Sequence, residues 1–340
     1  MDGEVNKINL DIQLLKEAIV KTVAYFDMFD FPLTGYEIWQ YLSVKCELKE
    51  IMAVLKEVYQ FNPLNPPLPS DADALAGRQG GQIESKNGFY YLSGREDIIR
   101  ERMKRYNYSD KKLKLAIRLS IIFKLIPWIK LIAVGNVIGE HNLRHEGDID
   151  LFVITAAKRI WLSRFFCNAI TKILGLRPSP NKIRNKICLS FFISDDNLDL
   201  NYLRLSSGGE QKKDDSYFTY WLVGLMPIYN PDQTYQKFIS ANPWLVEQLP
   251  NWQVTGPSGR RNSGSSPSAF YQEIIDLLIG GLEPQAKSLQ LKFLPANLKR
   301  IMNLDSRVVI DDRILKFHAN DRREEYREIF KDKIERIINN

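Results

Sequence analysis

"IAVGNVIGEHNLRHEGDIDLFVIT", residues 132–155, is the stretch from which the architecture of this chain is best predicted. An apolar segment ends at Gly135-Asn136, and Asp148 and Asp150 open a second apolar segment. Side chains two residues apart on a strand leave the same face, so the two carboxylates should lie side by side while Ile149 faces the core. Two adjacent negative charges repel each other unless a cation lies between them. The pattern therefore predicts a site for a divalent metal ion.

The segments around this stretch alternate between strand and helix patterns. We expect strands at residues 128–134, 148–155 and 185–194, a short helix at 137–143 and a long amphipathic helix at 158–176. Strands separated by helices are typical of a mixed α/β sheet.

The N-terminal part reads as a small domain of helices and a hairpin. Helices are expected at residues 10–26, 35–42 and 48–59, with Thr34 and Glu37 placed as a capping box. Residues 62–82 are rich in Pro, Gly, Ala and Asp and are expected at a hairpin tip, with residues 83–96 as the returning strand. Residues 1–95 are thus predicted to form a winged-helix-like domain.

The remaining segments are predicted to be mainly helical. Residues 96–127 read as a helical connector whose basic side chains either contact phosphate groups or cover a solvated helix face. These side chains are Arg100, Arg102, Lys104, Arg105, Lys111, Lys112 and Lys114. The core of the α/β sheet is assigned to residues 128–205, and residues 206–340 to a C-terminal helical region with a flexible linker near 255–268.

Composition limits the class of protein. The 340 residues are 44% apolar and 26% charged, which is typical of a globular chain with two or three folding units. A net charge of +6 leaves room for an anionic partner such as a nucleotide, although a solvated surface explains it equally well. Three scattered cysteines, a polar N-terminus and an apolar window (119–134) broken by lysines and a proline predict a cytoplasmic protein without a membrane span.

The stretch at 128–155 resembles the signature of the nucleotidyltransferase superfamily that includes DNA polymerase beta. That signature is an apolar strand, Gly followed by Gly or Ser, about ten further residues, and Asp-x-Asp opening the next strand. Here 11 residues separate Asn136 from Asp148. The layout of the whole chain also resembles uncharacterised bacterial proteins of this superfamily that carry an N-terminal winged-helix-like module.

The resemblance implies an α+β fold with a polymerase-beta-like mixed sheet, and transfer of a nucleotidyl group from an NTP to an acceptor. Asp148 and Asp150 would hold Mg²⁺ in a two-metal site, and Gly135 and Asn136 would bind the nucleotide. The acceptor stays open between a small molecule, an RNA end and a protein hydroxyl.

The chain departs from the family pattern in ways that keep a second interpretation open. Asn136 stands where Gly or Ser is usual, and no acid lies within residues 185–194, where the third carboxylate is expected. Cys188 or Ser190 should face the aspartate pair instead, and the acids at 195, 196 and 199 lie beyond the strand. The alternative is a catalytically degenerate nucleotide-binding or regulatory module whose winged helix contacts DNA or a protein partner. A scaffold without any ligand is a third possibility.

Other polar and aromatic residues have mainly structural interpretations. The presumed recognition helix at 48–59 balances two lysines with two glutamates, which favours packing against a protein over reading DNA. Solvated or packed positions are expected for the three histidines, for the basic loop before the third strand and for the aromatic stripe of the long helix. These residues are His141, His145, His318, Lys182, Arg184, Lys186, Trp161, Phe165 and Phe166.

Overall fold

The computed structural model describes residues 2–59, 83–135, 138–139, 141–179, 182–205, 215–253 and 267–339. The chain forms two compact units, each assembled from segments that are separated in sequence. The first unit contains residues 1–104, 244–253 and 325–340, and the second contains residues 105–243 and 254–324. The sequence patterns predicted domains made of consecutive segments instead. The expected insertion at 62–82 and most of the expected linker at 255–268 lie outside the described residues.

The first unit is built from helices and a three-stranded antiparallel sheet in the order β1-β3-β2. Its elements are α1 (Asp2–Asp27), β1 (Leu33–Thr34), α2 (Gly35–Gln40), α3 (Leu48–Tyr59), β2 (Ile83–Lys86), β3 (Phe89–Leu92), α9 (Trp244–Gln248), and most of α13 (Arg323–Asn339). Helix α5 (Asp97–Phe123) contributes its first residues to this unit and the rest to the second.

Local signals in this unit form as expected, with one correction. The Thr34 side chain accepts from the Glu37 N–H while the Glu37 carboxylate accepts from the Thr34 N–H at 2.8 Å, which completes the predicted capping box. Strands β2 and β3 pair around Asn87-Gly88, where both residues have positive φ as a tight hairpin turn requires. The hairpin tip is therefore this dipeptide, and residues 83–96, expected as one returning strand, contain both strands of the hairpin.

The second unit is organised around a six-stranded sheet. Its other elements are β4 (Ile129–Val134), β5 (Ile149–Thr155), α6 (Ile160–Ile173), β6 (Ile187–Ser194), η2 (Asn201–Leu203), α7 (Ser216–Val223), β7 (Met226–Tyr229), α8 (Thr234–Ser240), α10 (Ala269–Ile279), η3 (Gly280–Leu282), α11 (Glu283–Lys292), α12 (Ala296–Ile301), β8 (Val308–Ile310) and β9 (Ile314–Phe317).

The sheet is mixed and has the order β7-β4-β5-β6-β9-β8. Strand β4 pairs antiparallel with β5, and β5 pairs parallel with β6, so the three predicted strands lie at its centre. Strands β7, β8 and β9 extend both edges, although residues 206–340 were expected to be helical. Most described residues of that segment are helical, but the prediction missed these strands because each is only three or four residues long and adjoins helical patterns.

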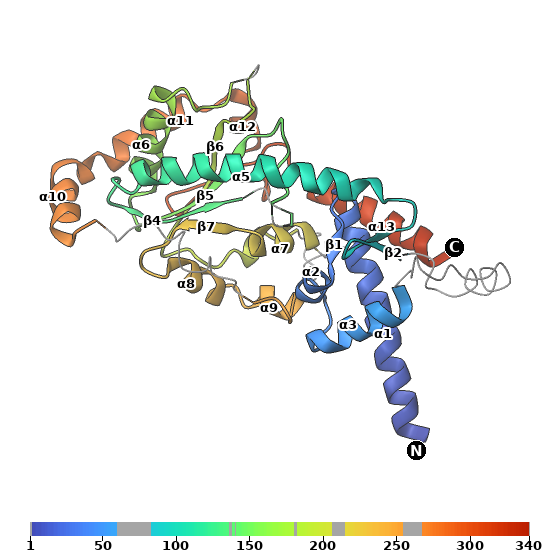
Figure 1. Ribbon diagram of the computed structural model, residues 1–340. Helices are drawn as coiled ribbons and strands as arrows, with labels where there is room; N and C mark the ends of the chain where they lie inside the picture. The colour runs from blue at the N-terminus through green and yellow to red at the C-terminus, as the bar shows by residue number, and fades with distance from the viewer. Residues whose placement is uncertain are drawn as a thin grey trace. The chain divides into compact units, whose positions relative to one another are not determined.

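Side chains of β5 alternate between the two faces of the sheet. Leu151 and Val153 belong to a core cluster that includes residues of α5 and α6, whereas Phe152 packs against Trp221 of α7 and Phe238 of α8. Figure 1 shows α6 and α11 on one side of the sheet and α7 and α8 on the other. By this alternation Asp150 leaves the sheet on the α7 and α8 side. Among the described residues, no helix has both the length and the apolar character needed to cross a membrane.

Candidate functional site

Two aspartates and a cysteine meet at the beginning of the central parallel strands. Asp148 precedes β5, Asp150 is its second residue, and Cys188 lies opposite Asp150 on β6 in the strand register. One potential ligand atom from each of the three lies within 4.8 Å of the other two, and all three residues are partly buried. The two carboxylates therefore leave the same side of the sheet, as the Asp-x-Asp spacing predicts. The group has the composition and the spacing of a site that could hold a metal ion.

Backbone hydrogen bonds fix this group at the strand ends. The N–H of Ile149 donates to the carbonyl of Lys186 at 2.8 Å, which joins the start of β5 to the start of β6. The N–H of Gly135 donates to the carbonyl of Asp150 at 2.8 Å, so the glycine bend lies directly beside the second aspartate. The pairing of β4, β5 and β6 therefore fixes the backbone positions of the two aspartates and the cysteine.

Gly135 is required here by packing. A Cβ atom at this position would lie 2.9 Å from Cζ2 of Trp221, whose indole ring stacks on Phe191. The N–H of Gly135 is already bonded to Asp150 and is therefore not the group that can bind a phosphate. Any phosphate contact from this bend would come from the residues that follow, beginning with Asn136, which lies outside the described residues.

The short helix expected at 137–143 is not found among the described residues of that segment. Ile138 and Gly139 form a bend, and Gly139 and His141 both have positive φ, which a right-handed helix does not tolerate. The expected helix N-terminus facing a phosphate was therefore wrong for the described part of the segment.

Helix α5 holds the segment that leads into the aspartate pair. Arg105, Ser109 and Lys112 are spaced by four and three residues, so they share one face of the helix, and all three are buried. Arg105 donates to the Oδ1 of Asn142 at 2.9 Å, and Ser109 accepts from the N–H of Leu143 at 2.9 Å.

Lys112 completes this set of contacts, because its amine donates to the carbonyl of Gly147, the residue before Asp148. Only 2% of Lys112 is exposed. In the sequence, Arg105 and Lys112 stand out only as members of a basic cluster. Their spacing of seven residues is the signal that could have separated them from the solvated members.

Electrostatics around the pair reflect burial and mutual repulsion. Burial raises the pKa of Asp150 to about 7, and the neighbouring charge of Asp148 acts in the same direction. The pKa of Asp148 is also raised by burial, although hydrogen bonding and the positive charge of Lys112 partly oppose this. Burial lowers the pKa of the Lys112 amine and raises that of the Cys188 thiol well above its usual range. Carboxylates that are difficult to ionise together are poised to bind a cation.

Cys188 occupies the place where the sequence analysis sought a third carboxylate. Its thiol is within hydrogen-bonding reach of both aspartates and of Ser190, whose Oγ lies 2.9 Å from Nε2 of His318. His318 packs against Phe191, and burial lowers its pKa to about 3, so it is a neutral packed histidine as expected.

The acids after β6 lie at the opposite end of the parallel strands. The N–H of Asp195 donates to the carbonyl of Thr155, the last residue of β5, and its carboxylate accepts from the N–H of Ala157. The carboxylates of Asp196 and Asp199 accept hydrogen bonds from residues within the same turn. These three acids are therefore turn residues and do not complete the site.

The remaining polar and aromatic residues contact neighbouring side chains or backbone groups outside the aspartate–cysteine group. The rings of His141 and His145 lie 4.5 Å and 4.4 Å from those of Tyr106 and Tyr108. Arg184 contacts the Nε2 of His145, and the Lys186 amine donates to the carbonyl of Gly175. Trp161 is 1% exposed and belongs to the core, as predicted, and Phe165 and Phe166 pack against that core. Lys182 is exposed and forms a backbone bridge with Ser179.

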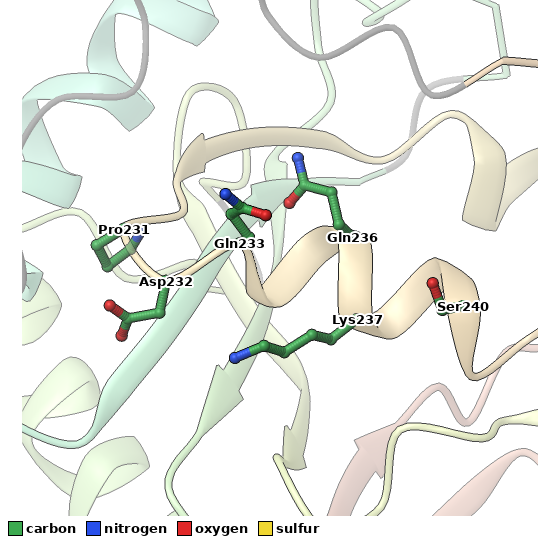
Figure 2. A pocket seen from close by; sticks show the side chains of 6 residues that line it. All are labelled: Pro231, Asp232, Gln233, Gln236, Lys237 and Ser240. Atoms are coloured by element: carbon green, nitrogen blue, oxygen red, sulfur yellow. The ribbon is translucent and has the colours of Figure 1, made fainter.

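A shallow surface hollow lies elsewhere in the second unit. Figure 2 shows its lining residues at the start of α8 and along that helix: Pro231, Asp232, Gln233, Gln236, Lys237 and Ser240. None of them belongs to the group formed by Asp148, Asp150 and Cys188. The hollow offers one carboxylate, one amine and two amides on an open surface, so we assign no chemistry to it.

Neither a family model nor a curated protein nor a solved structure matches this chain. Two carboxylates and a thiol, buried at strand ends beside a glycine bend, can bind a divalent cation and present it to an anionic ligand.

Proposed function

We propose that this protein is nucleotidyltransferase-like and transfers a nucleotidyl group from an NTP to an acceptor in a metal-dependent reaction. The observation that carries the proposal is the convergence of Asp148 and Asp150 beside Gly135, with the glycine N–H bonded to the Asp150 carbonyl at 2.8 Å. This is the spatial relation that the strand, glycine bend and Asp-x-Asp pattern requires.

The arrangement of the central strands supports the proposal. The strand before the glycine bend pairs antiparallel with the strand that carries the acids, and a third strand lies parallel beside them. A polymerase-beta-like sheet is proposed on this basis, and a winged helix is proposed for α1, α2, α3 and the β2–β3 hairpin of the first unit.

The donor set fits one divalent cation better than two Mg²⁺ ions. Asp148 and Asp150 would hold the cation, which would neutralise charge on the phosphates and on the leaving pyrophosphate. A second Mg²⁺ would require further oxygen ligands, and β6 offers the sulfur of Cys188 at that place.

The chain's own residues have defined roles in this proposal. The amine of Lys112 fixes the carbonyl of Gly147 and thereby the backbone that presents Asp148. The Gly135–Asp150 hydrogen bond sets the distance between the bend and the acids. Among the described residues no third carboxylate joins the pair, so the proton of the acceptor would pass to solvent, and we therefore expect slow turnover.

The proposal is tested by label transfer. Full-length protein would be incubated with each α-labelled NTP, a divalent cation and candidate acceptors, namely small alcohols and amines, RNA ends and protein hydroxyls. We expect transfer that Asp148→Asn or Asp150→Asn abolishes and that Asp195→Asn leaves unchanged. Asp195 is the matched control because it is an exposed acid at the opposite end of the same strands.

The second candidate is a degenerate nucleotide-binding or regulatory module, favoured by the presence of a thiol where a third acid is expected. In that case the same variants would lose NTP binding although the wild-type protein transfers no label.

Helix α3 would then contact a protein more readily than DNA, because Lys49 is paired with Glu47 at 2.7 Å and Met52 is exposed. Full-length protein that binds duplex DNA with a strong salt dependence would instead indicate a DNA-contacting module.

A further inference from the structure

The third donor at the site differs in kind from the first two. In a tetrahedral site, two atoms that both ligate one ion at about 2.0–2.3 Å lie about 3.3–3.8 Å apart. The donor atoms of Asp148, Asp150 and Cys188 lie within 4.8 Å of one another, so one ion between them requires only small side-chain adjustments. Two Mg²⁺ ions about 3.5–4 Å apart would need more oxygen ligands than the two carboxylates supply.

We infer that Asp148, Asp150 and Cys188 form a mononuclear site with a thiolate ligand, which binds Zn²⁺ or Co²⁺ in preference to Mg²⁺. Thiolate is a soft ligand that selects zinc-like ions, whereas Mg²⁺ requires hard oxygen ligands in near-octahedral geometry. Three protein donors would leave a fourth tetrahedral position open, as in zinc sites that bind a water molecule or a substrate.

Backbone pairing makes the convergence of these donors a property of the fold. Cys188 is directly opposite Asp150 in the parallel register, and Ile149, between the two aspartates, is bonded to Lys186 on the same neighbouring segment. The three donors therefore come from two strands and are not a local turn of acidic residues.

Charge balance is consistent with a single divalent ion. When the metal binds, the S–H bond of Cys188 breaks, a metal–sulfur bond forms, and the proton leaves to solvent. Two carboxylates and a thiolate then carry three negative charges, which the divalent ion and the ammonium of Lys112 beside Asp148 neutralise.

The test uses the metal alone. Full-length protein stripped with a chelator would be titrated with Co²⁺, and its absorption spectrum recorded. We expect one equivalent to bind with a sulfur-to-cobalt charge-transfer band in the near ultraviolet. Competition with a chromophoric chelator would then give the affinities for Zn²⁺, Co²⁺, Mn²⁺ and Mg²⁺, with Zn²⁺ tightest.

Substitutions of Cys188 test whether its sulfur coordinates the metal ion. Loss of an outer-shell partner typically costs 10–100-fold in metal affinity, so Cys188→Ser should weaken Zn²⁺ binding by at least about 100-fold and remove the band. Cys188→Asp should remove the band and raise the affinity for Mg²⁺ and Mn²⁺. Cys46→Ser, at a cysteine of the first unit, should change neither quantity.

Several outcomes would overturn the inference. The first is absence of the charge-transfer band in the wild-type protein, a result that does not depend on the folding of any variant. The second is persistence of the band in Cys188→Ser, and the third is Mg²⁺ binding as tight as Zn²⁺ binding. Because no nucleotide is present, these results are independent of label transfer. A negative transfer assay would not affect the conclusion about the metal ligands. A negative metal titration would not affect the label-transfer assay with Mg²⁺.

Discussion

Replacing one aspartate of the pair should stabilise the metal-free protein. In Asp150→Asn a polar side chain of nearly the same size remains, but the carboxylate that burial and Asp148 oppose is removed. The pKa of Asp150 is raised to about 7, against about 3.9 for an unperturbed aspartate. At about 1.36 kcal/mol for each pKa unit, this difference sets an upper bound of about 4 kcal/mol. Partial exposure and the coupling to Asp148 reduce the expected gain to about 1–3 kcal/mol at slightly alkaline pH.

The pH dependence follows from the same carboxylate. Because its folded pKa is raised, the folded state holds this proton more tightly than the unfolded state, so the contribution of Asp150 to the stability of the wild-type protein falls as pH rises. The loss should develop between about pH 4 and about pH 7 and be complete above that range. His318, whose folded pKa is lowered to about 3, contributes in the opposite direction, so the effect of Asp150 is measured as the stability gained in Asp150→Asn, which should grow across this range. Asp195→Asn should follow the wild-type protein within about 0.5 kcal/mol.

Denaturant unfolding of chelator-treated protein at several pH values measures this effect. Adding a divalent cation should reverse the order of stability, because the cation stabilises only the folded state that binds it. A metal-free Asp150→Asn variant that is less stable than the wild-type protein at slightly alkaline pH would refute the reasoning. So would a stability difference between Asp150→Asn and the wild-type protein that does not grow as pH rises from about 4 to about 7.

Three further substitutions test individual contacts by the same unfolding measurement. Lys112→Met keeps the apolar stem but leaves the Gly147 carbonyl without its buried donor, and should cost about 1–3 kcal/mol; an unchanged stability would contradict the anchoring role. Gly135→Ala should cost about 1–3 kcal/mol, because the new Cβ lies 2.9 Å from the Trp221 ring; a variant within about 0.5 kcal/mol of the wild-type protein would show that the ring moves freely. Thr34→Ala removes the capping side chain of α2 and should cost about 1 kcal/mol, whereas Thr34→Ser should retain most of the cap.

The centre of the second unit was predictable because its patterns are strong. Apolar runs bounded by glycine and aspartate gave the positions of β4, β5 and β6, and a spacing of two placed Asp148 and Asp150 on one side of the sheet. The Thr34–Glu37 capping box was equally predictable, because its two residues always lie three positions apart in sequence.

Other features depend on contacts that sequence periodicity does not encode. The sequence could not choose between Cys188 and Ser190 because the register between β5 and β6 shifts after the Asp150–Cys188 pair, so that Phe152 lies opposite Phe191. Such a bulge breaks the alternation of faces on which the choice relied. Lys112 looks like any lysine on an amphipathic helix until the loop that its amine binds is placed beside it.

The central claim is that the aspartate pair binds a nucleoside triphosphate through a divalent cation. It is tested most directly by calorimetric titration of full-length protein with a non-hydrolysable NTP analogue, with and without a divalent cation. We predict binding that requires the cation, is lost in Asp150→Asn and is retained in Asp195→Asn. Equal binding by wild-type protein and Asp150→Asn, or no binding with any of Mg²⁺, Mn²⁺, Co²⁺ and Zn²⁺, would contradict the claim.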